Sequence, residues 1–221
     1  MSKRRIEITP DLMMRAYRAG LFPMAEGRAA DKLYWLDPEL RGVLPLEGFH
    51  MPRRLMRKLS SGSFTVTADA DFPGVITGCA APREGRWNTW INVTIEQLFI
   101  ELHRMGHAHS VETWKDGVLV GGLYGVVLGG AFFGESMFSS VSDASKVALA
   151  HLVARLRLGG FTLLDTQFVT SHLARFGTIE LPRDDYKTAL ARAVEVPARW
   201  LASPEPAALA QALRDLAGSG T

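Results

Sequence analysis

The feature that most limits the fold is a strand–helix–strand unit in the second half of the chain. Residues 131–138 are an apolar, aromatic run typical of a strand, and residues 161–167 are a second such run. Between them, a helix is predicted to begin at a Ser142 cap, reach Leu158 and stop at Gly159-Gly160. Connections of this kind are right-handed in about 98% of cases, so the two strands are predicted to be parallel neighbours in one sheet.

Three polar side chains interrupt these two apolar strands. Side chains alternate with period two along a strand, so Glu135 in the first strand is predicted to share a face with Phe133 and Met137. Asp165 and Gln167 lie two positions apart in the second strand and are predicted to share one face, where Glu135 can join them. Buried carboxylates are costly unless paired, so the group is either an ordinary buried hydrogen-bond network or a functional site.

The remaining sequence alternates between short strands and helices. Further strands are predicted at 33–36, 42–46, 64–67, 110–115, 118–128 and 178–181. Further helices are predicted at 9–17, 51–59, 72–79, 94–106, 171–176, 184–193 and 207–216. We therefore predict an α+β fold with a mixed sheet, divided into a small N-terminal α/β domain (1–62), a larger domain (63–203) and a tail (204–221) outside the functional core.

The order of elements in the larger domain resembles the GNAT-superfamily N-acetyltransferase fold. Those enzymes bind the pyrophosphate of acetyl-coenzyme A through a glycine-rich turn at the start of the central helix. The corresponding stretch here, residues 139–146, has no glycine, and it contains Asp143, whose charge would repel a pyrophosphate. The predicted fold is therefore acyltransferase-like, with an acyl donor other than coenzyme A.

Composition narrows the class of protein further. The chain is 47% hydrophobic and 22% charged, as in soluble globular proteins, and it has neither a bilayer-length apolar run nor the apolar start of a signal peptide. We therefore expect a cytoplasmic protein without a membrane partner. The single cysteine, Cys79, excludes an internal disulfide and is expected to be buried. No metal is predicted, because His103, His107 and His109 lack a matching carboxylate motif.

Two local features leave alternatives open. The helix at 51–59 places Arg53 with Arg57, and Arg54 with Lys58, at i,i+4 spacing on one side; its core-facing side is predicted to hold Leu55, Met56 and Leu59. This basic side is either a solvated surface or a contact for a phosphate backbone. The predicted loop at 81–91 carries Trp87 and Trp90, which either pack against the core or act as stacking platforms; the residues alone favour packing.

Many short segments, in collinear order over about residues 8–193, resemble the bacterial leucyl/phenylalanyl-tRNA-protein transferase family. In the N-terminal half the resemblance lies in residues 17–24 (YRAGLFPM), Tyr34-Trp35, Asp37-Pro38, 41–44 (RGVL) and 88–91 (NTWI). It continues through 110–114 (SVETW), 119–126 (LVGGLYGV), 133–139 (FGESMFS), Ala144-Ser145-Lys146, 164–167 (LDTQ) and Leu181-Pro182-Arg183. The set as a whole is specific, although no single segment is decisive.

The resemblance implies transfer of Leu or Phe, and less readily Met, from aminoacyl-tRNA to the N-terminus of proteins that begin with Arg or Lys. In the bacterial N-degron pathway this residue marks the protein for degradation. No cofactor is implied, and we expect a monomer. The reaction is aminolysis of an ester that is already activated, so positioning and exclusion of water supply much of the acceleration.

The family's site residues can be carried over to matching positions. Trp35 and Trp90 match the tryptophans that hold the 3′-terminal adenosine, and the pocket for the Leu or Phe side chain is implied to include Leu123, Leu152 and Leu156. Gln167 is implied to act on the attacking amine with help from Asp165. Because an amide is too weak a base, we interpret Gln167 as an acceptor that orients the amine and Asp165 as the charge that fixes and polarises that amide. Glu135 would bind the cationic acceptor or complete the network.

Three other functions compete with this interpretation. A coenzyme-A-dependent N-acetyltransferase would share the predicted fold order, but this chain lacks the glycine-rich turn of those enzymes. A non-catalytic RNA-binding protein could use Arg53, Arg54, Arg57 and Lys58 with the tryptophans, but it would leave Glu135, Asp165 and Gln167 unexplained. A peptidoglycan-type aminoacyl-tRNA ligase is a third alternative, although those chains are usually larger.

Overall fold

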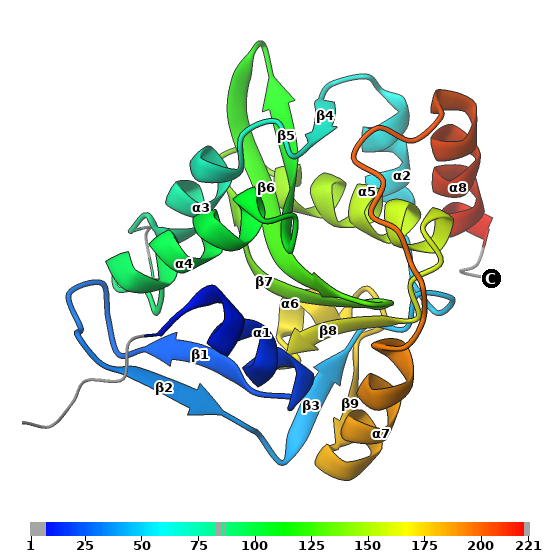
Figure 1. Cartoon of the computed structure of the whole chain (residues 1–221). Helices are drawn as coiled ribbons and strands as arrows, with labels where there is room; N and C mark the ends of the chain where they lie inside the picture. Colours follow the sequence, from blue (N-terminus) through cyan, green and yellow to red (C-terminus); the bar gives the residue numbers. More distant parts are fainter. Residues whose placement is uncertain (1–7, 83–84, 86, 219–221) are drawn as a thin grey trace, which may run out of the picture.

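The computed structural model describes residues 8–82, 85 and 87–218 (Figure 1). The helices are α1 (Pro10–Arg18), α2 (Arg53–Ser60), α3 (Phe72–Ala80), α4 (Val93–Arg104), α5 (Ala144–Leu158), α6 (Ser171–Ala174), α7 (Arg183–Ala193) and α8 (Pro206–Gly218). The strands are β1 (Phe22–Ala25), β2 (Leu33–Leu36), β3 (Leu40–Val43), β4 (Thr65–Ala68), β5 (Ala108–Lys115), β6 (Val118–Leu128), β7 (Ala131–Ser139), β8 (Leu163–Gln167) and β9 (Ile179–Pro182).

A seven-stranded mixed sheet forms the centre of the molecule, in the order β4-β5-β6-β7-β8-β3-β9. β7 and β8 are parallel, with Phe133 opposite Asp165, and every other described pair in this sheet is antiparallel. The prediction of a mixed α+β sheet with parallel β7 and β8 is therefore confirmed. β1 and β2 form a separate two-stranded antiparallel sheet.

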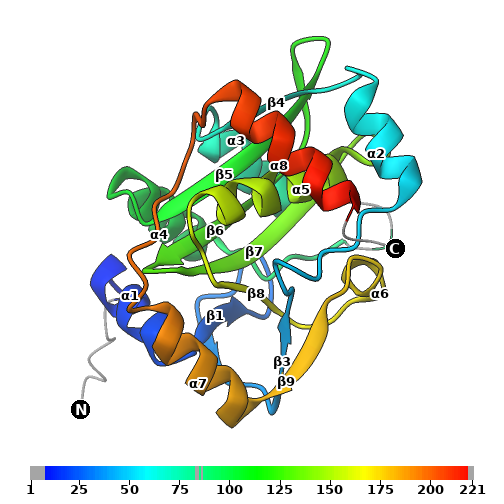
Figure 2. The ribbon, with the colours of Figure 1, turned by 90° about the vertical axis from the view of Figure 1, so that its right-hand side faces the viewer.

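Helices cover both faces of the β4–β7 part of the sheet. α3 and α4 lie on one face, and α5 lies on the other beneath α8 (Figures 1 and 2). α5 is buried around most of its circumference, as expected for a helix between a sheet and a second helix. Leu216 of α8 is completely buried against the α5 side of the core. The predicted tail helix thus completes the hydrophobic core on that side.

Several local predictions were wrong. Residues 22–25 form a strand, β1, which was not predicted because proline at position 23 argues against a strand. β1 lies in a two-stranded sheet, where the missing N–H of proline is tolerated. β3 spans 40–43 rather than 42–46. The N-cap of α5 is Asp143, not Ser142, with φ +72° and no capping hydrogen bond from its side chain. Met56, predicted to face the core, is 37% exposed.

The N-terminal part of the chain contributes to the central sheet. β3 lies between β8 and β9 and is hydrogen-bonded to both, although it belongs to the segment predicted as the small domain 1–62. The division into 1–62, 63–203 and 204–221 remains a prediction, and β3 places any such boundary within a shared sheet. In the described part of the chain, no helix has the length and apolar character needed to cross a membrane.

Candidate functional site

The Asp165 carboxylate is the shared acceptor of a buried polar cluster near the end of β8. Arg41 of β3 donates from Nε to Asp165 Oδ1 at 3.0 Å and from Nη2 to Oδ2 at 2.7 Å. Tyr186 of α7 donates its hydroxyl to Oδ2 at 2.7 Å. Both Arg41 and Asp165 are almost completely buried, and the guanidinium also lies over the Phe22 and Tyr186 rings. Although burial lowers the pKa of Arg41, its hydrogen bonds to the Asp165 carboxylate raise that pKa overall, so Arg41 remains charged.

Gln167 follows in a strained backbone conformation. Its φ is +56°, in the left-handed region that residues other than glycine rarely adopt, and the Phe168 N–H donates to the Thr166 carbonyl at 2.6 Å, closing a γ-turn around Gln167. Such conformations cost about 1–3 kcal/mol and are kept where the surroundings fix them. Here Asp165 Oδ1 accepts the Gln167 backbone N–H at 2.8 Å. Asp165 therefore holds the Gln167 backbone, and no described bond joins its carboxylate to the Gln167 side-chain amide as we had expected.

The opposite strand leaves space for this turn through a glycine. Gly42 of β3 pairs with Gln167, and the β3–β8 register shifts between Gly42 and Val43. A Cβ atom on Gly42 would lie 2.7 Å from the Phe168 carbonyl carbon and 2.8 Å from Thr166 Oγ1. Only glycine fits at this position without a shift of the turn.

Glu135 lies at a second irregularity, a β-bulge in β7. Tyr124 of β6 pairs with Ser136, and the next residue, Gly125, pairs with Gly134, so Glu135 is the extra residue. The bulge breaks the alternation: Phe133 and Met137, predicted to share the face of Glu135, pack into different core clusters. Bulges commonly redirect a side chain beside a functional site.

The Glu135 carboxyl group receives two hydrogen bonds on one oxygen. The Tyr17 hydroxyl donates to Oε1 at 2.8 Å, and Gln167 Nε2 donates to the same oxygen at 3.2 Å. Burial raises the pKa of Glu135 to about 8; the Tyr17 hydrogen bond and the Arg41 charge oppose this rise, and the Asp165 charge adds to it. Burial and the nearby carboxylate also raise the pKa of Tyr17 well above its usual value, so its hydroxyl remains a donor. The predicted convergence of Glu135, Asp165 and Gln167 is therefore present.

An apolar cavity of about 290 Å³ opens beside this cluster. It is lined by Phe22, Met24, Trp90, Leu123, Tyr124, Gly134, Glu135, Ser136, Met137, Leu149, Leu152, Leu164, Thr166, Gln167, Phe168, Thr170, His172 and Leu173. Among the described residues, six buried polar side-chain atoms have no hydrogen-bond partner, and four belong to this lining: Tyr124 Oη, Glu135 Oε2, Thr166 Oγ1 and His172 Nε2. Burial lowers the pKa of His172, which favours its neutral form. Buried polar atoms are normally paired, so these atoms are suited to hydrogen bonds with a bound molecule.

The residues assigned to the aminoacyl end of the substrate are only partly brought together. Trp90, Leu123 and Leu152 line the cavity, whereas Leu156 is completely buried in the core and is not among the lining residues. Trp35 is half-buried in β2, opposite Pro23, and is not among the described residues that line the cavity. The Trp90 carbonyl accepts the Ala25 N–H at 3.2 Å, so the Trp90 loop is fastened to the β1–β2 sheet that carries Trp35.

The basic helix α2 lies away from this lining. Arg53, Arg54 and Arg57 are exposed, and Lys58 is half-buried with its ammonium 5.3 Å from the centre of the Phe64 ring. Arg54 lies 3.7 Å from Asp143 at the start of α5, where Lys146 also pairs with that carboxylate. The Arg54 charge is therefore partly compensated, and Arg53 and Arg57 are the better candidates for contact with an anionic partner.

The histidines form a different cluster from the one considered in the sequence. Asp69, His103 and His109 have ligand atoms within 4.8 Å of one another. The Asp69 carboxylate already accepts hydrogen bonds from His109 Nδ1, the Ser110 N–H and Trp200 Nε1, at 2.9, 2.9 and 2.7 Å. This cluster fastens the segment after α7 to the sheet. Cys79 is buried in α3, as predicted.

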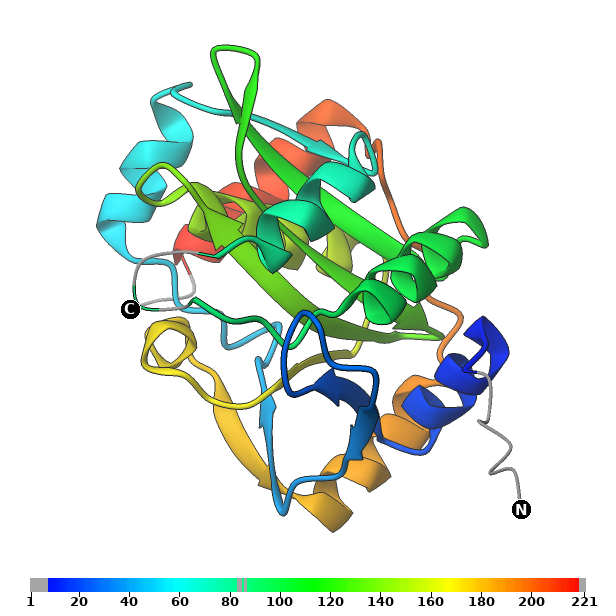
Figure 3. The same cartoon turned by 90° about the vertical axis from the view of Figure 1, so that its left-hand side faces the viewer.

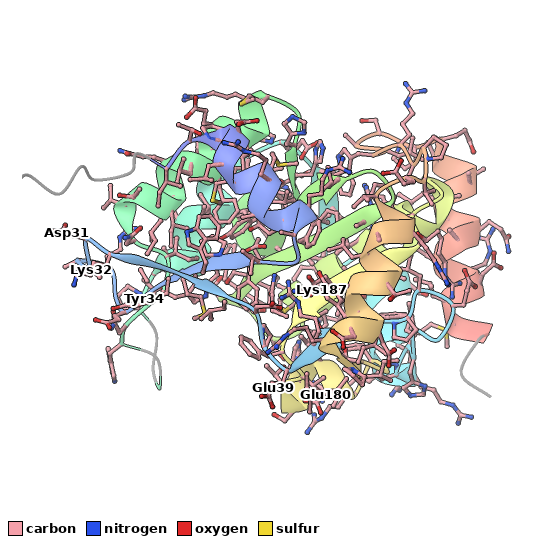
Figure 4. All side chains as sticks on the ribbon, turned by 60° about the horizontal axis from the view of Figure 1, so that its bottom comes forward. Asp31, Lys32, Tyr34, Glu39, Glu180 and Lys187 are labelled. Atoms are coloured by element: carbon pink, nitrogen blue, oxygen red, sulfur yellow. The ribbon has the colours of Figure 1, made fainter. Side chains whose placement is uncertain are left out.

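Sequence reasoning did not identify three residues that support the site: Tyr17, Arg41 and Tyr186. They come from α1, β3 and α7, and each contacts a carboxylate more than 20 positions away. One feature of the sequence could have identified Arg41: it is a charged residue beside a glycine in an apolar strand. Its burial, however, depends on the pairing of β3 with β8 and β9. Lys187 of α7, which is labelled in Figure 4, also pairs with Asp37 at 2.7 Å, and this pair fastens α7 to the segment between β2 and β3.

Comparison with known proteins gives a consistent family. The model of the leucyl/phenylalanyl-tRNA protein transferase family matches residues 43–191, and the model of its N-terminal domain matches residues 7–39. The chain is 59% identical to the leucyl/phenylalanyl-tRNA–protein transferase of Nitrobacter winogradskyi, over 96% of this chain and 95% of the relative. It is 57% identical to the protein of the same name from Rhodopseudomonas palustris, with the same coverage. A solved structure, L-PGS from Bacillus licheniformis, is similar only weakly, with a TM-score of 0.42 and 12% identity over 70% of this chain and 51% of that chain.

Proposed function

This chain belongs to the leucyl/phenylalanyl-tRNA protein transferase family, and from that premise we propose how its site transfers an aminoacyl group from tRNA to a protein. The donor is aminoacyl-tRNA carrying Leu or Phe, and less readily Met. The acceptor is a protein with N-terminal Arg or Lys, which the added residue marks for degradation in the cytoplasm. The single observation that carries the proposal is the apolar cavity whose wall holds the hydrogen-bonded pair Gln167 and Glu135.

The reaction forms one amide bond and breaks one ester bond. The acceptor's α-amine attacks the aminoacyl carbonyl carbon, and the tetrahedral intermediate expels the 3′-oxygen of the terminal ribose. The amine must lose a proton, and the leaving oxygen must gain one, so the protein has to accept and return a proton without a cofactor. A mostly apolar cavity excludes water, which would otherwise hydrolyse the activated ester.

Gln167 orients the attacking amine. Its Nε2 donates to Glu135 Oε1, which leaves its side-chain oxygen to accept a hydrogen bond from the amine. Asp165 acts indirectly. Its carboxylate accepts hydrogen bonds from Arg41 and Tyr186, and it also accepts the Gln167 backbone N–H. Asp165 is therefore a positioning residue that maintains the strained turn, rather than a group that polarises the amide.

Glu135 accepts the proton from the attacking amine. Its Oε2 has no hydrogen-bond partner among the described atoms, and its pKa of about 8 matches the usual value of a peptide α-amino group, about 7.7–8.0. The acceptor attacks as the neutral amine; the ionised Glu135 takes the proton that the attacking nitrogen loses as the amide forms, and this proton then passes to the leaving 3′-oxygen. The same carboxylate, while charged, also attracts the cationic acceptor.

The aminoacyl-adenosine end occupies the cavity and its mouth. Trp90 stacks on the terminal adenine from the cavity wall, and Trp35 contributes from the adjoining β1–β2 sheet. The Leu or Phe side chain packs against Leu123 and Leu152, which belong to the same core cluster as Leu156. Further along the tRNA, Arg53, Arg54, Arg57 and Lys58 contact backbone phosphates.

We further infer that the central sheet has the acyltransferase-like fold of the GNAT superfamily without its coenzyme A site. Asp143, paired with Arg54 and Lys146, occupies the start of α5, and the Ser145 N–H already donates to Ser139 Oγ at 3.2 Å. A pyrophosphate would have to displace these groups. A coenzyme-A-dependent N-acetyltransferase is therefore the less favoured function.

Incubation with Phe-tRNA and a peptide that begins with Arg tests the proposal directly. Mass spectrometry should show addition of one phenylalanyl group at the peptide N-terminus, and parallel reactions with acetyl-coenzyme A should show no acetyl group. A peptide with an acetylated N-terminus is the matched control and should remain unmodified. Acetyl transfer alone would favour the N-acetyltransferase, and tRNA binding without either transfer would favour the non-catalytic RNA-binding protein.

A further inference from the structure

Trp87 is the large apolar side chain with the greatest exposure in the described part of the chain. It is 77% exposed, whereas Trp90, three positions later in the same loop, is half-buried. An indole in water leaves a large apolar face unburied, and that face can stack on a ligand. The core packing expected for loop tryptophans therefore does not apply to Trp87.

The loop that displays Trp87 is fastened at the next residue. Asn88 Nδ2 donates to the Glu26 carbonyl at 3.0 Å, and its Oδ1 accepts the Arg28 N–H at 3.3 Å and the Thr89 N–H at 2.9 Å. The approach is close, because a Cβ atom on Gly27 would lie 2.7 Å from Asn88 Nδ2. These contacts join the loop to the turn between β1 and β2, which reaches toward it from below (Figure 3). The Trp87 ring is therefore presented on a fixed base.

A groove of about 230 Å³ lies beside the indole. Its described lining combines the last turn of α3 with both fastened segments: Arg28, Thr77, Ala80, Ala81, Pro82, Trp87, Asn88 and Thr89. The Arg28 guanidinium is held by Glu96 at 2.5 Å and by the Ile91 carbonyl at 3.0 Å, so its charge is largely compensated. An apolar wall with polar edges and little net charge matches a nucleobase, which has an apolar face and a hydrogen-bonding edge.

The groove and the cavity of the transfer site are lined by adjacent residues of one loop: residues 87–89 line the groove, and Trp90 lines the cavity. Residues 87 and 90 are at most about 11 Å apart along an extended chain, so the two rings can serve successive nucleotides of one strand. We propose that Trp87 stacks on a base of the acceptor strand that immediately precedes the terminal adenosine, with the Arg28 groove receiving its edge. This inference rests on the proposed function, since it assigns a second nucleotide subsite to the same donor.

The test compares two minimal donors with the full-length protein: phenylalanyl-adenosine, and the phenylalanylated trinucleotide cytidine-cytidine-adenosine. With an Arg-starting peptide as acceptor, Trp87→Ala should raise KM for the trinucleotide about five- to thirtyfold, because base stacking contributes about 1–2 kcal/mol at an exposed ring. KM for phenylalanyl-adenosine should stay within about twofold of wild type. Trp87→Phe keeps an aromatic platform and should recover most of the trinucleotide affinity.

Met105→Ala, at an exposed position after α4, is the matched control and should change neither KM. Because Trp87 is exposed, the melting temperature of Trp87→Ala should match wild type. Equal KM changes for the two donors, no change for either, or a change confined to the acceptor peptide would overturn the second subsite. Failure of the wild-type protein to transfer from Phe-tRNA, assayed beside the two minimal donors, would instead refute the proposed function.

Discussion

Replacing Glu135 by Gln tests the claim that burial raises the pKa of this carboxyl group to about 8, which leaves a minor ionised fraction at neutral pH to accept a proton. Both donors to Glu135, the Tyr17 hydroxyl and Gln167 Nε2, bind Oε1, and Oε2 has no described partner. A glutamine can keep its oxygen at the Oε1 position and place its amide nitrogen at the Oε2 position. The variant is therefore a close mimic of the protonated side chain, and it cannot ionise.

The sign of the effect follows from the raised pKa. The folded-state pKa is about 8 against an ordinary value of 4.5, so the folded state binds more protons than the unfolded state between these two pH values. The stabilisation from the protonated carboxyl is complete below about pH 4.5 and is lost as the pH rises toward about 8. At about 1.36 kcal/mol per pH unit, wild type should lose roughly 2–3 kcal/mol of unfolding free energy relative to Glu135→Gln between about pH 5 and 7.

Urea unfolding at several pH values between about 5 and 8 measures this difference, because groups common to both proteins cancel. Glu101→Gln, which removes an exposed carboxylate on α4, is the control and should give a curve parallel to wild type. The Glu135→Gln curve should diverge upward from wild type as the pH rises. Parallel curves for wild type and Glu135→Gln would refute the burial argument and, with it, the role of Glu135 as the proton acceptor.

Three further predictions concern the substrate and the reaction. The double variant Arg53→Gln, Arg57→Gln should bind tRNA more weakly. The slope of the logarithm of the binding constant against the logarithm of the salt concentration should decrease in magnitude by about 1.4–1.8, as measured by titration at several salt concentrations. An unchanged slope would show that these two arginines do not contact tRNA phosphates. Trp90→Ala should raise KM for aminoacyl-tRNA about five- to a hundredfold with little change in KM for the peptide, and equal changes accompanied by a lower melting temperature would indicate a packing role. Gln167→Ala should lower kcat with little change in tRNA affinity. Asp165→Asn should lower kcat and also destabilise the fold by about 3–5 kcal/mol. The two losses in kcat should be non-additive, and full activity of the double variant would exclude both residues from the reaction.

The general architecture could be predicted from the sequence because it depends on local signals. Apolar periodicity and glycine stops located most helices and strands, and the handedness of strand–helix–strand units predicted β7 and β8 as parallel neighbours. β1 was missed because proline at position 23 argues against a strand. The insertion of β3 between β8 and β9 was out of reach, since it depends on pairing over more than 100 residues.

The residues that hold the site illustrate a different limit. Asp165 and Gln167 were placed together by the rule that strand residues alternate, and they do lie together. Their contact, however, comes from a γ-turn at φ +56° and a backbone hydrogen bond, neither of which follows from residue type. Arg41 supplies the compensating charge from 124 positions away. The sequence thus predicted that Asp165 and Gln167 lie together, but not which of their atoms are in contact.

Two of the departures from regular strand geometry in the described chain coincide with the two side chains assigned to the reaction. The β7 bulge occurs at Glu135, and the strained turn at the end of β8 is centred on Gln167. A regular strand would have kept both side chains in the alternating pattern of the core, where carboxyl and amide groups are costly. The bulge and the turn instead direct them toward each other beside the cavity, and the buried Arg41–Asp165 pair and Gly42 keep the turn in place. Local rules of sequence fail here because the site requires a geometry that those rules disfavour, and the surrounding contacts supply the free energy that maintains it.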